Sequence, residues 1–216
     1  MMTKESDKRI RKRVNSMVYN LYHGSNRQRG ERMLFDGEKL ISRGEKHWLG
    51  DGLYLFFDFL YAYKWIIDMY KKRIESCTPE YEQLIKDYII LEFKVTLDDE
   101  KIFDLTNPNH KILYDRTLKA MKAKGELPNR KYPEGVVLNY MFEEIFNKGQ
   151  FEAVQAVFQM YKNQYDTRWR LGYMPQKQIC IRNWDIVQTL NEYDFEHRVE
   201  ESNELIKSLY YKNITL

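Results

Sequence analysis

The sequence has few cysteines and no segment rich in glycine, serine or proline. Cys77 and Cys180 are the two thiols among 216 residues, too few for a disulfide framework or a four-thiolate zinc site. This cysteine content is typical of a reducing compartment, so we expect an intracellular, cytoplasmic protein. Ten glycines and five prolines are scattered along the chain. No stretch has the composition of a linker between two domains. A single folded domain is therefore expected.

Long uncharged apolar runs are also absent. The most apolar stretch, residues 53–70, is interrupted by Asp58, Lys64 and Asp68, whereas a membrane-spanning helix needs about 20 apolar residues. The first residues lack the apolar core of about 7 to 15 residues that a secretory signal requires. The sequence therefore predicts no membrane partner.

Charge is distributed unevenly. The chain has 35 basic and 32 acidic side chains, a formal net charge of +3. Residues 1–20 contain six basic and two acidic side chains, a net charge of +4, which leaves −1 for the other 196. We predict a basic N-terminal arm, residues 1–16, and one domain, residues 17–216. Six charges on an arm support only weak, salt-dependent binding to nucleic acid or another acidic partner.

The pattern of apolar residues predicts a mixture of strands and helices. Strands are expected at residues 17–22, 53–57, 89–96, 101–105 and 178–182, and helices at 32–41, 59–70, 78–86, 108–125, 133–148 and 194–211. Residues 151–161 are ambiguous between the two. Strands at both ends, with helices between and after them, favour an α+β domain with a mostly antiparallel sheet.

Three short motifs adjoin predicted strands. His23-Gly24-Ser25 ends the first, Gly52-Leu53-Tyr54 opens the second, and Gln178 opens the last. A dinucleotide site needs polar groups for its riboses and main chain that approaches closely, which glycine allows. Any one motif is a weak signal, and their order along the chain is the more specific one.

In this order the motifs resemble the ADP-ribosyltransferase superfamily, in particular the branch of poly(ADP-ribose) polymerases and small bacterial mono-ADP-ribosyltransferases. The resemblance extends from about Tyr19 to Leu190. It implies an ADP-ribosyltransferase-like fold, in which two small, mostly antiparallel sheets form an NAD cleft with flanking helices.

The resemblance also implies roles for individual residues. His23 would bind a ribose hydroxyl, the Gly24 backbone the nicotinamide carboxamide, and Ser25 the adenosine-side ribose. Tyr54 would stack on the nicotinamide ring, and Arg27 or Arg29 would bind the pyrophosphate. NAD⁺ is then the substrate, and no metal is implied.

Gln178 departs from the glutamate of many family members. An amide accepts or donates hydrogen bonds but carries no charge and is no base. With His23, Tyr54 and Gln178 as the catalytic set, the resemblance implies transfer of single ADP-ribose units to protein, RNA or DNA. A bacterial or phage toxin or antiviral defence effector, with an antitoxin or regulatory partner, fits this activity. The alternatives are an NAD glycohydrolase, an RNA 2′-phosphotransferase-like enzyme and a non-catalytic binding module.

Other polar residues carry weaker signals. Gln176 resembles the first position of a Gln-x-Glu turn, and His47 with Trp48 lies in a polar loop that could cover a substrate. Cys180 alternates with isoleucines and is expected in the core rather than as a nucleophile. His110 and His197 have no cysteine or histidine partner at ligand spacing, so no metal site is expected.

Overall fold

Seven strands form one mixed sheet in a computed structural model, which describes residues 16–44, 46–73, 81–128, 133–158, 176–199 and 201–203. The strands are β1 (Ser16–Asn26), β2 (Leu53–Phe56), β3 (Tyr88–Asp98), β4 (Ile102–Asp104), β5 (Ala153–Phe158), β6 (Gln176–Ile181) and β7 (Val187–Glu192). Their order is β4-β5-β6-β2-β1-β3-β7. Neighbouring strands are antiparallel except β4 and β5. The predicted α+β class with a mostly antiparallel sheet is confirmed.

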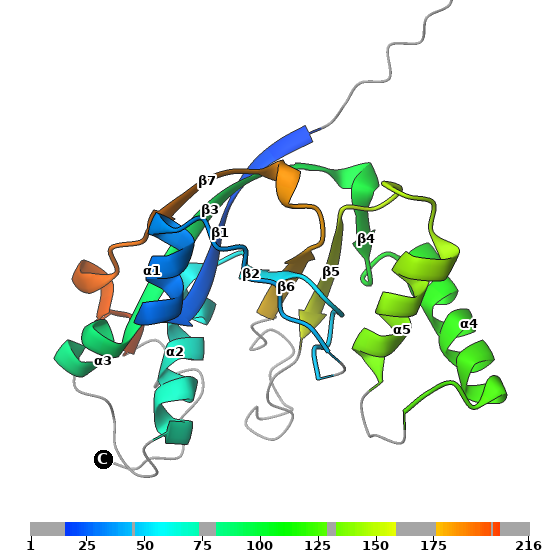
Figure 1. Cartoon of the computed structure of the whole chain (residues 1–216), viewed down its shortest axis with the longest axis horizontal. Coiled ribbons are helices and arrows are strands. Elements are labelled where there is room, and N and C mark those ends of the chain that lie inside the picture. The colour runs from blue at the N-terminus through cyan, green and yellow to red at the C-terminus, as the bar shows by residue number, and fades with distance from the viewer. Residues whose placement is uncertain are drawn as a thin grey trace, which may run out of the picture.

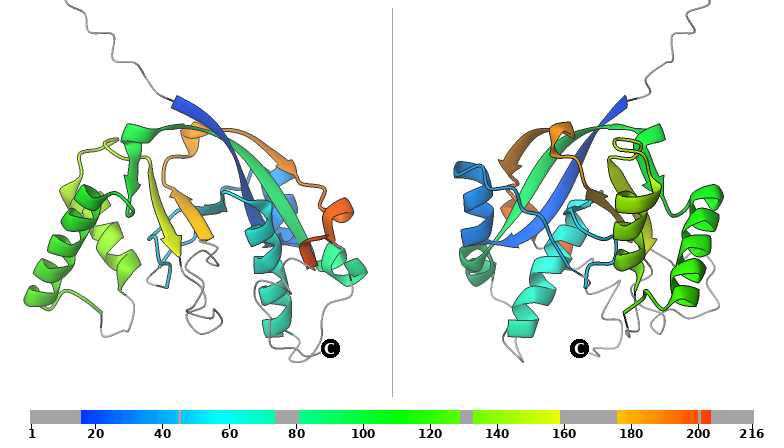
Figure 2. Two further views of the ribbon diagram at one scale, coloured as in Figure 1. Left: turned by 180° about the vertical axis from the view of Figure 1, so that it is seen from behind. Right: turned by 45° about the vertical axis from the view of Figure 1, so that its right-hand side comes forward.

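The helices lie in two groups at the ends of the sheet (Figures 1 and 2). One group has α1 (Arg27–Phe35), α2 (Phe59–Arg73) and α3 (Tyr81–Asp87), and the other has α4 (Pro108–Lys124) and α5 (Glu134–Tyr140), which continues as a π-helical turn (Met141–Ile145). Short 3-10 turns cover Asp99–Lys101, Trp184–Ile186 and Glu196–Arg198. Within the described residues, no helix is long and apolar enough to cross a membrane.

The expectation of two separate sheets was wrong. β2 pairs with β6 along its whole length, from Leu53 opposite Ile181 to Phe56 opposite Gln178. At its end it also pairs with β1, where Tyr22 lies opposite Phe56. This narrow junction joins the β4-β5-β6-β2 half to the β1-β3-β7 half, so the hydrogen-bonded sheet is continuous.

Local sequence signals explain where several helices begin and end. The Asn107 side chain accepts a hydrogen bond from the Asn109 amide at 2.9 Å, Pro108 follows at the first helical position, and Gly125 ends α4 with φ 72°. This is the predicted helix of residues 108–125. Asp58 likewise accepts from the Leu60 amide at 2.8 Å at the start of α2.

Other elements differ from the prediction. Helix α1 begins at Arg27 rather than at residue 32, because Asn26 caps it directly after β1. The ambiguous residues 151–161 contain strand β5, and β7 was not predicted at all. Most of the predicted C-terminal helix, like Thr78 and Pro79, lies outside the described residues.

Three apolar clusters form the core and leave room for a site between two of them. Alternate residues of β3 separate two clusters: Ile89 and Leu91 face the α1 side, whereas Tyr88 and Ile90 face α2. The third cluster packs α4 and α5 against β5 and β6. Tyr54 and Phe56 share one face of β2, since they are two residues apart. Phe56 belongs to the α2 cluster and Tyr54 contacts the α4–α5 cluster.

Candidate functional site

A pocket of about 400 Å³ lies where these two clusters meet the central strands. Its size is in the range of about 300 to 1,000 Å³ common for small-molecule sites. The lining residues come from β1, β2, β6, α2 and the loop before β2, and are His23, Ser42, Lys46, His47, Trp48, Tyr54, Phe56, Trp65, Asp68, Met69, Gln176 and Gln178. Aromatic rings and a few polar groups therefore share the lining.

The structure brings the three predicted catalytic residues together. His23 lies on β1, Tyr54 on β2 and Gln178 on β6, and these three strands are neighbours at the centre of the sheet. Gln178 lies directly opposite Phe56, two residues after Tyr54. Strand pairing thus unites side chains that are far apart in the sequence.

His23 is fixed in one tautomer by the backbone of Tyr54. Its Nδ1 lies 2.8 Å from the Tyr54 carbonyl oxygen, and a carbonyl only accepts, so Nδ1 carries the proton. Burial lowers the pKa of His23, and the positive charge of Arg29 lowers it further against the opposing effect of the Tyr54 bond. The ring is therefore neutral at pH 7, with Nε2 as an acceptor for a ligand hydroxyl.

The Tyr54 hydroxyl is occupied by the preceding loop. It donates to the Gly50 carbonyl at 2.7 Å and accepts from the Leu49 amide at 2.8 Å. Burial also raises the pKa of this phenol. Tyr54 is thus poorly suited to proton transfer; it offers the pocket a ring and anchors the loop.

A polar network missed by the sequence analysis holds this loop, residues 42–52. Asp51 bonds Asn139 of α5 twice: its amide donates at 2.8 Å, and its Oδ1 accepts at 3.0 Å. Arg182 Nη2 donates to Asn139 Oδ1 at 2.8 Å and to the Leu49 carbonyl at 3.3 Å. No local signal reveals the Asp51–Asn139 pair, because its members are 88 residues apart.

Gly135 lets α5 approach the same loop. A Cβ atom built at Gly135 would lie 1.7 Å from the His47 carbonyl oxygen, far inside van der Waals contact. The close approach holds His47 and Trp48 at the pocket, and the His47 ring centroid lies 5.7 Å from that of Tyr54. A glycine inside a predicted helix was the available sequence signal for this contact.

Two glutamines of β6 face the pocket with different surroundings. Gln178 is partly exposed, whereas Gln176 is only 5% exposed. Gln176 Oε1 is buried and has no hydrogen-bond partner among the residues that the structure describes. An unpaired buried acceptor costs about 1 to 3 kcal/mol, so a ligand N–H or O–H at this position would be favoured.

Gly24 and Ser25 are buried but do not line the pocket. A Cβ at Gly24 would lie 2.6 Å from the Ala62 carbonyl oxygen and 2.8 Å from Ile66 Cγ2. The glycine therefore allows β1 to pack tightly against α2, a structural role that the resemblance did not imply.

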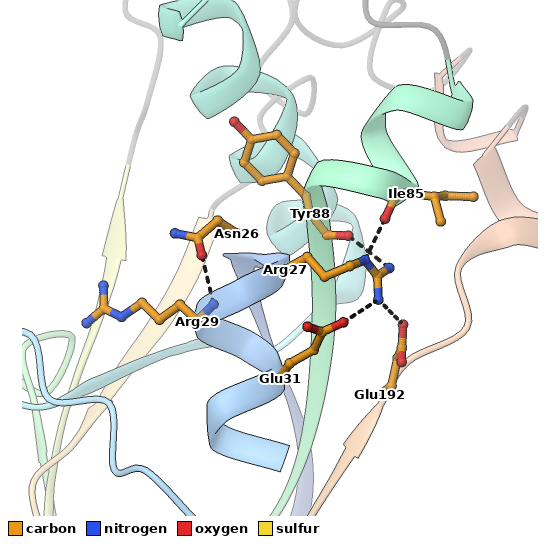
Figure 3. A network of polar contacts seen from close by, with 7 residues as sticks. All are labelled: Asn26, Arg27, Arg29, Glu31, Ile85, Tyr88 and Glu192. Carbon is orange, nitrogen blue, oxygen red and sulfur yellow. Dashed lines mark hydrogen bonds and ion pairs between the residues drawn. The ribbon is translucent and has the colours of Figure 1, made fainter. Parts of the chain in front are cut away.

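The two arginines expected at a pyrophosphate have different surroundings (Figure 3). Arg27 donates to the carbonyls of Ile85 at 2.8 Å and Tyr88 at 3.2 Å, and pairs with Glu192 at 3.3 Å. Its guanidinium thus ties α1 to α3, β3 and β7 instead of facing the pocket. Arg29 is exposed, extends away from Arg27, and affects the pKa of His23. Neither arginine is among the pocket-lining residues.

The remaining candidates lie outside the pocket lining. His110 Nδ1 accepts from the Asp104 amide at 2.9 Å and its ring stacks on Phe103, and His197 is exposed. Cys180 is buried, and burial raises its pKa to about 12, which fits the expected core role. The described parts of the chain contain no cluster of three or more potential metal ligands.

Fold and site define an α+β protein with a pocket at the centre of a seven-stranded sheet. No family model and no solved structure matches the chain. It is 32% identical over 200 residues to the uncharacterized protein MJ0359 of Methanocaldococcus jannaschii, an alignment that covers 84% of this chain and 90% of the archaeal protein. The chain belongs to the same family as MJ0359.

Proposed function

We propose that the protein is a mono-ADP-ribosyltransferase that cleaves NAD⁺ and transfers ADP-ribose to a macromolecule. The observation that carries the proposal is the convergence of His23, Tyr54 and Gln178 on one pocket. Sequence motifs alone predict these residues, and they come from three strands that are adjacent in the sheet but not in the sequence. The motifs thus share a site of suitable size and polarity.

The pocket offers groups suited to this reaction. The bond between ribose C1′ and the nicotinamide nitrogen breaks, its electron pair leaves with nicotinamide, and positive charge develops on the ribose. An acceptor nucleophile then bonds to C1′ and loses a proton. Neutral His23 would accept from a ribose hydroxyl, and the Tyr54 ring would contact the nicotinamide. The Gln178 amide would hold the ribose through its dipole.

A nicotinamide-release assay tests the activity. The wild type should release nicotinamide from NAD⁺, and His23→Ala should reduce the rate about 10- to 100-fold, the effect of losing about 1.4 to 2.8 kcal/mol of hydrogen bonding in the transition state. Tyr54→Ala should also lose activity. His197→Ala is the matched control, because His197 is exposed and outside the pocket lining. Full activity of both pocket variants would contradict the proposed site.

The same assay separates the alternative activities. Release that requires cell extract supports transfer to an acceptor, whereas equal release without extract supports an NAD glycohydrolase. The uncharged Gln178 favours a second candidate, a non-catalytic binding module, which would bind NAD⁺ without releasing nicotinamide. Mass spectrometry of extract treated with labelled NAD⁺ would identify a protein, RNA or DNA acceptor. Toxin or defence roles, an antitoxin partner and a cytoplasmic location belong to this proposal.

Gln178→Glu tests the third catalytic position. A carboxylate here would stabilise positive charge on the ribose, so we expect nicotinamide release to increase or its acceptor dependence to change. The Gln188→Glu variant makes the same change at an exposed position of β7, outside the pocket lining. Equal effects of the two substitutions would contradict a specific role for Gln178.

A further inference from the structure

Helix α2 places a carboxylate in the pocket that the sequence motifs did not include. Trp65, Asp68 and Met69 line the pocket from this helix. Among the described lining residues, Asp68 is the single carboxylate. It lies on a different element from His23, Tyr54 and Gln178, and it adds a negative charge to the described lining.

The Asp68 carboxylate is held by a buried lysine. Lys64, one helical turn earlier, places Nζ 2.5 Å from Asp68 Oδ2. The Lys64 side chain is 4% exposed and that of Asp68 is 29% exposed, so the pair extends from the core to the pocket. One carboxylate oxygen is thus fixed, while Oδ1 has no hydrogen-bond partner among the described residues.

Asp68 and Lys46 give the pocket charges of opposite sign on separate elements. Lys46 comes from loop 42–52, and Asp68 from α2. A ligand with a cationic ring and an anionic group complements this arrangement. NAD⁺ has both, a positively charged pyridinium and a pyrophosphate, whereas the reduced nicotinamide ring of NADH is neutral.

We propose that Asp68 binds the pyridinium end of the dinucleotide and thereby selects NAD⁺ over NADH. The inference rests on the proposed function and adds a specificity-determining residue to it. Because the ring loses its positive charge as the glycosidic bond breaks, Asp68 favours the bound substrate rather than the transition state. Its removal should therefore raise KM for NAD⁺ without lowering kcat.

Isothermal titration with NAD⁺ and with NADH tests the selection. We expect the wild type to bind NAD⁺ more tightly, and Asp68→Asn to weaken NAD⁺ binding about tenfold, the range of a partly screened charge contact, with little change for NADH. Asp115→Asn is the matched control, because Asp115 forms the same i, i+4 pair with Lys111 at 2.5 Å on α4, outside the pocket lining. It should leave both affinities unchanged.

Two further variants guard against a folding defect. The double variant Lys64→Met, Asp68→Asn removes both charges of the pair, so no buried ammonium loses this carboxylate, and it should lose NAD⁺ selectivity as Asp68→Asn does. Asp68→Glu should retain part of it. If the single and the double variant both keep the wild-type preference for NAD⁺ over NADH, the proposed role of Asp68 is overturned, whereas the proposed function is not. Failure of the wild type to bind NAD⁺ would overturn the proposed function, and this inference with it.

Discussion

At the scale of the residue, His23 shows how strand geometry sets the chemical state of a side chain. The Tyr54 carbonyl fixes the proton on Nδ1, and burial together with Arg29 lowers the pKa. The motif predicted a histidine at a ligand site. It could not predict the tautomer, because the hydrogen-bond partner lies on another strand, 31 residues later.

The lowered pKa of His23 makes stability depend on pH. The folded state favours the neutral ring, so this contribution is complete above the unfolded-state pKa of about 6.5 and is lost as the pH falls through the lower folded-state pKa. Urea unfolding should show a smaller loss of stability between pH 7.5 and pH 5 for His23→Gln than for the wild type. His197→Gln is the exposed control. If the stability of His23→Gln depends on pH as that of the wild type does, the lowered pKa of His23 is contradicted.

At the scale of the element, loop 42–52 is held from three sides. The Tyr54 hydroxyl holds its backbone, Asn139 and Arg182 hold Asp51 and Leu49, and Gly135 brings α5 against His47. These contacts come from β2, α5 and the residue after β6, so the loop's position depends on the centre of the sheet and on the helix group that contains α5. A sequence motif cannot contain such information, because each contact joins distant segments.

Gly135→Ala should displace this loop. The added Cβ would overlap the His47 carbonyl oxygen, and we expect a loss of stability of about 1 to 3 kcal/mol, typical of overpacking, together with weaker NAD⁺ binding. Gly149→Ala is the comparison, since a Cβ there has no neighbour within 4 Å and only its φ of 76° is unfavourable. Urea unfolding and titration with NAD⁺ measure both effects. Equal NAD⁺ affinities in the two variants would contradict the role of the loop.

Local sequence signals predicted the ends of helix α4 better than any pattern predicted the strand at the edge of the sheet. The caps at Asn107 and Gly125 defined α4, because each acts within one helical turn. Strand β7 was missed, since it is an edge strand whose residues are partly or fully exposed and show no apolar alternation. The predicted helix over residues 133–148 keeps its α-form only to Tyr140, where the π-helical turn begins.

At the scale of the whole molecule, the sheet is continuous where two sheets were expected. A single residue pair, Tyr22 with Phe56, joins β1 to β2. The order of strands and helices in the sequence predicts the fold class. It contains no signal for the pairing of Tyr22 with Phe56, which makes the sheet continuous. The predicted site residues on β1, β2 and β6 nevertheless line one pocket. Each was predicted from the strand that carries it, and that prediction holds whether the strands form one sheet or two.

The basic arm should be separable from the pocket. Residues 1–20 carry +4 and the rest of the chain −1, so deletion of residues 1–13 should leave nicotinamide release within about twofold and weaken the salt dependence of binding to an acidic acceptor. A full-length variant with the six basic side chains changed to glutamine provides the matched control. Loss of nicotinamide release in both variants would show that the arm contributes to the site.

The central position of β6 has a consequence for biosynthesis. The pocket needs Gln178 from β6 beside His23 from β1, and contacts so distant in sequence form late in folding. A ribosome must therefore translate the chain through Gln178 before the pocket can close. Until then the pocket lacks Gln178, so products of earlier termination lack the complete pocket.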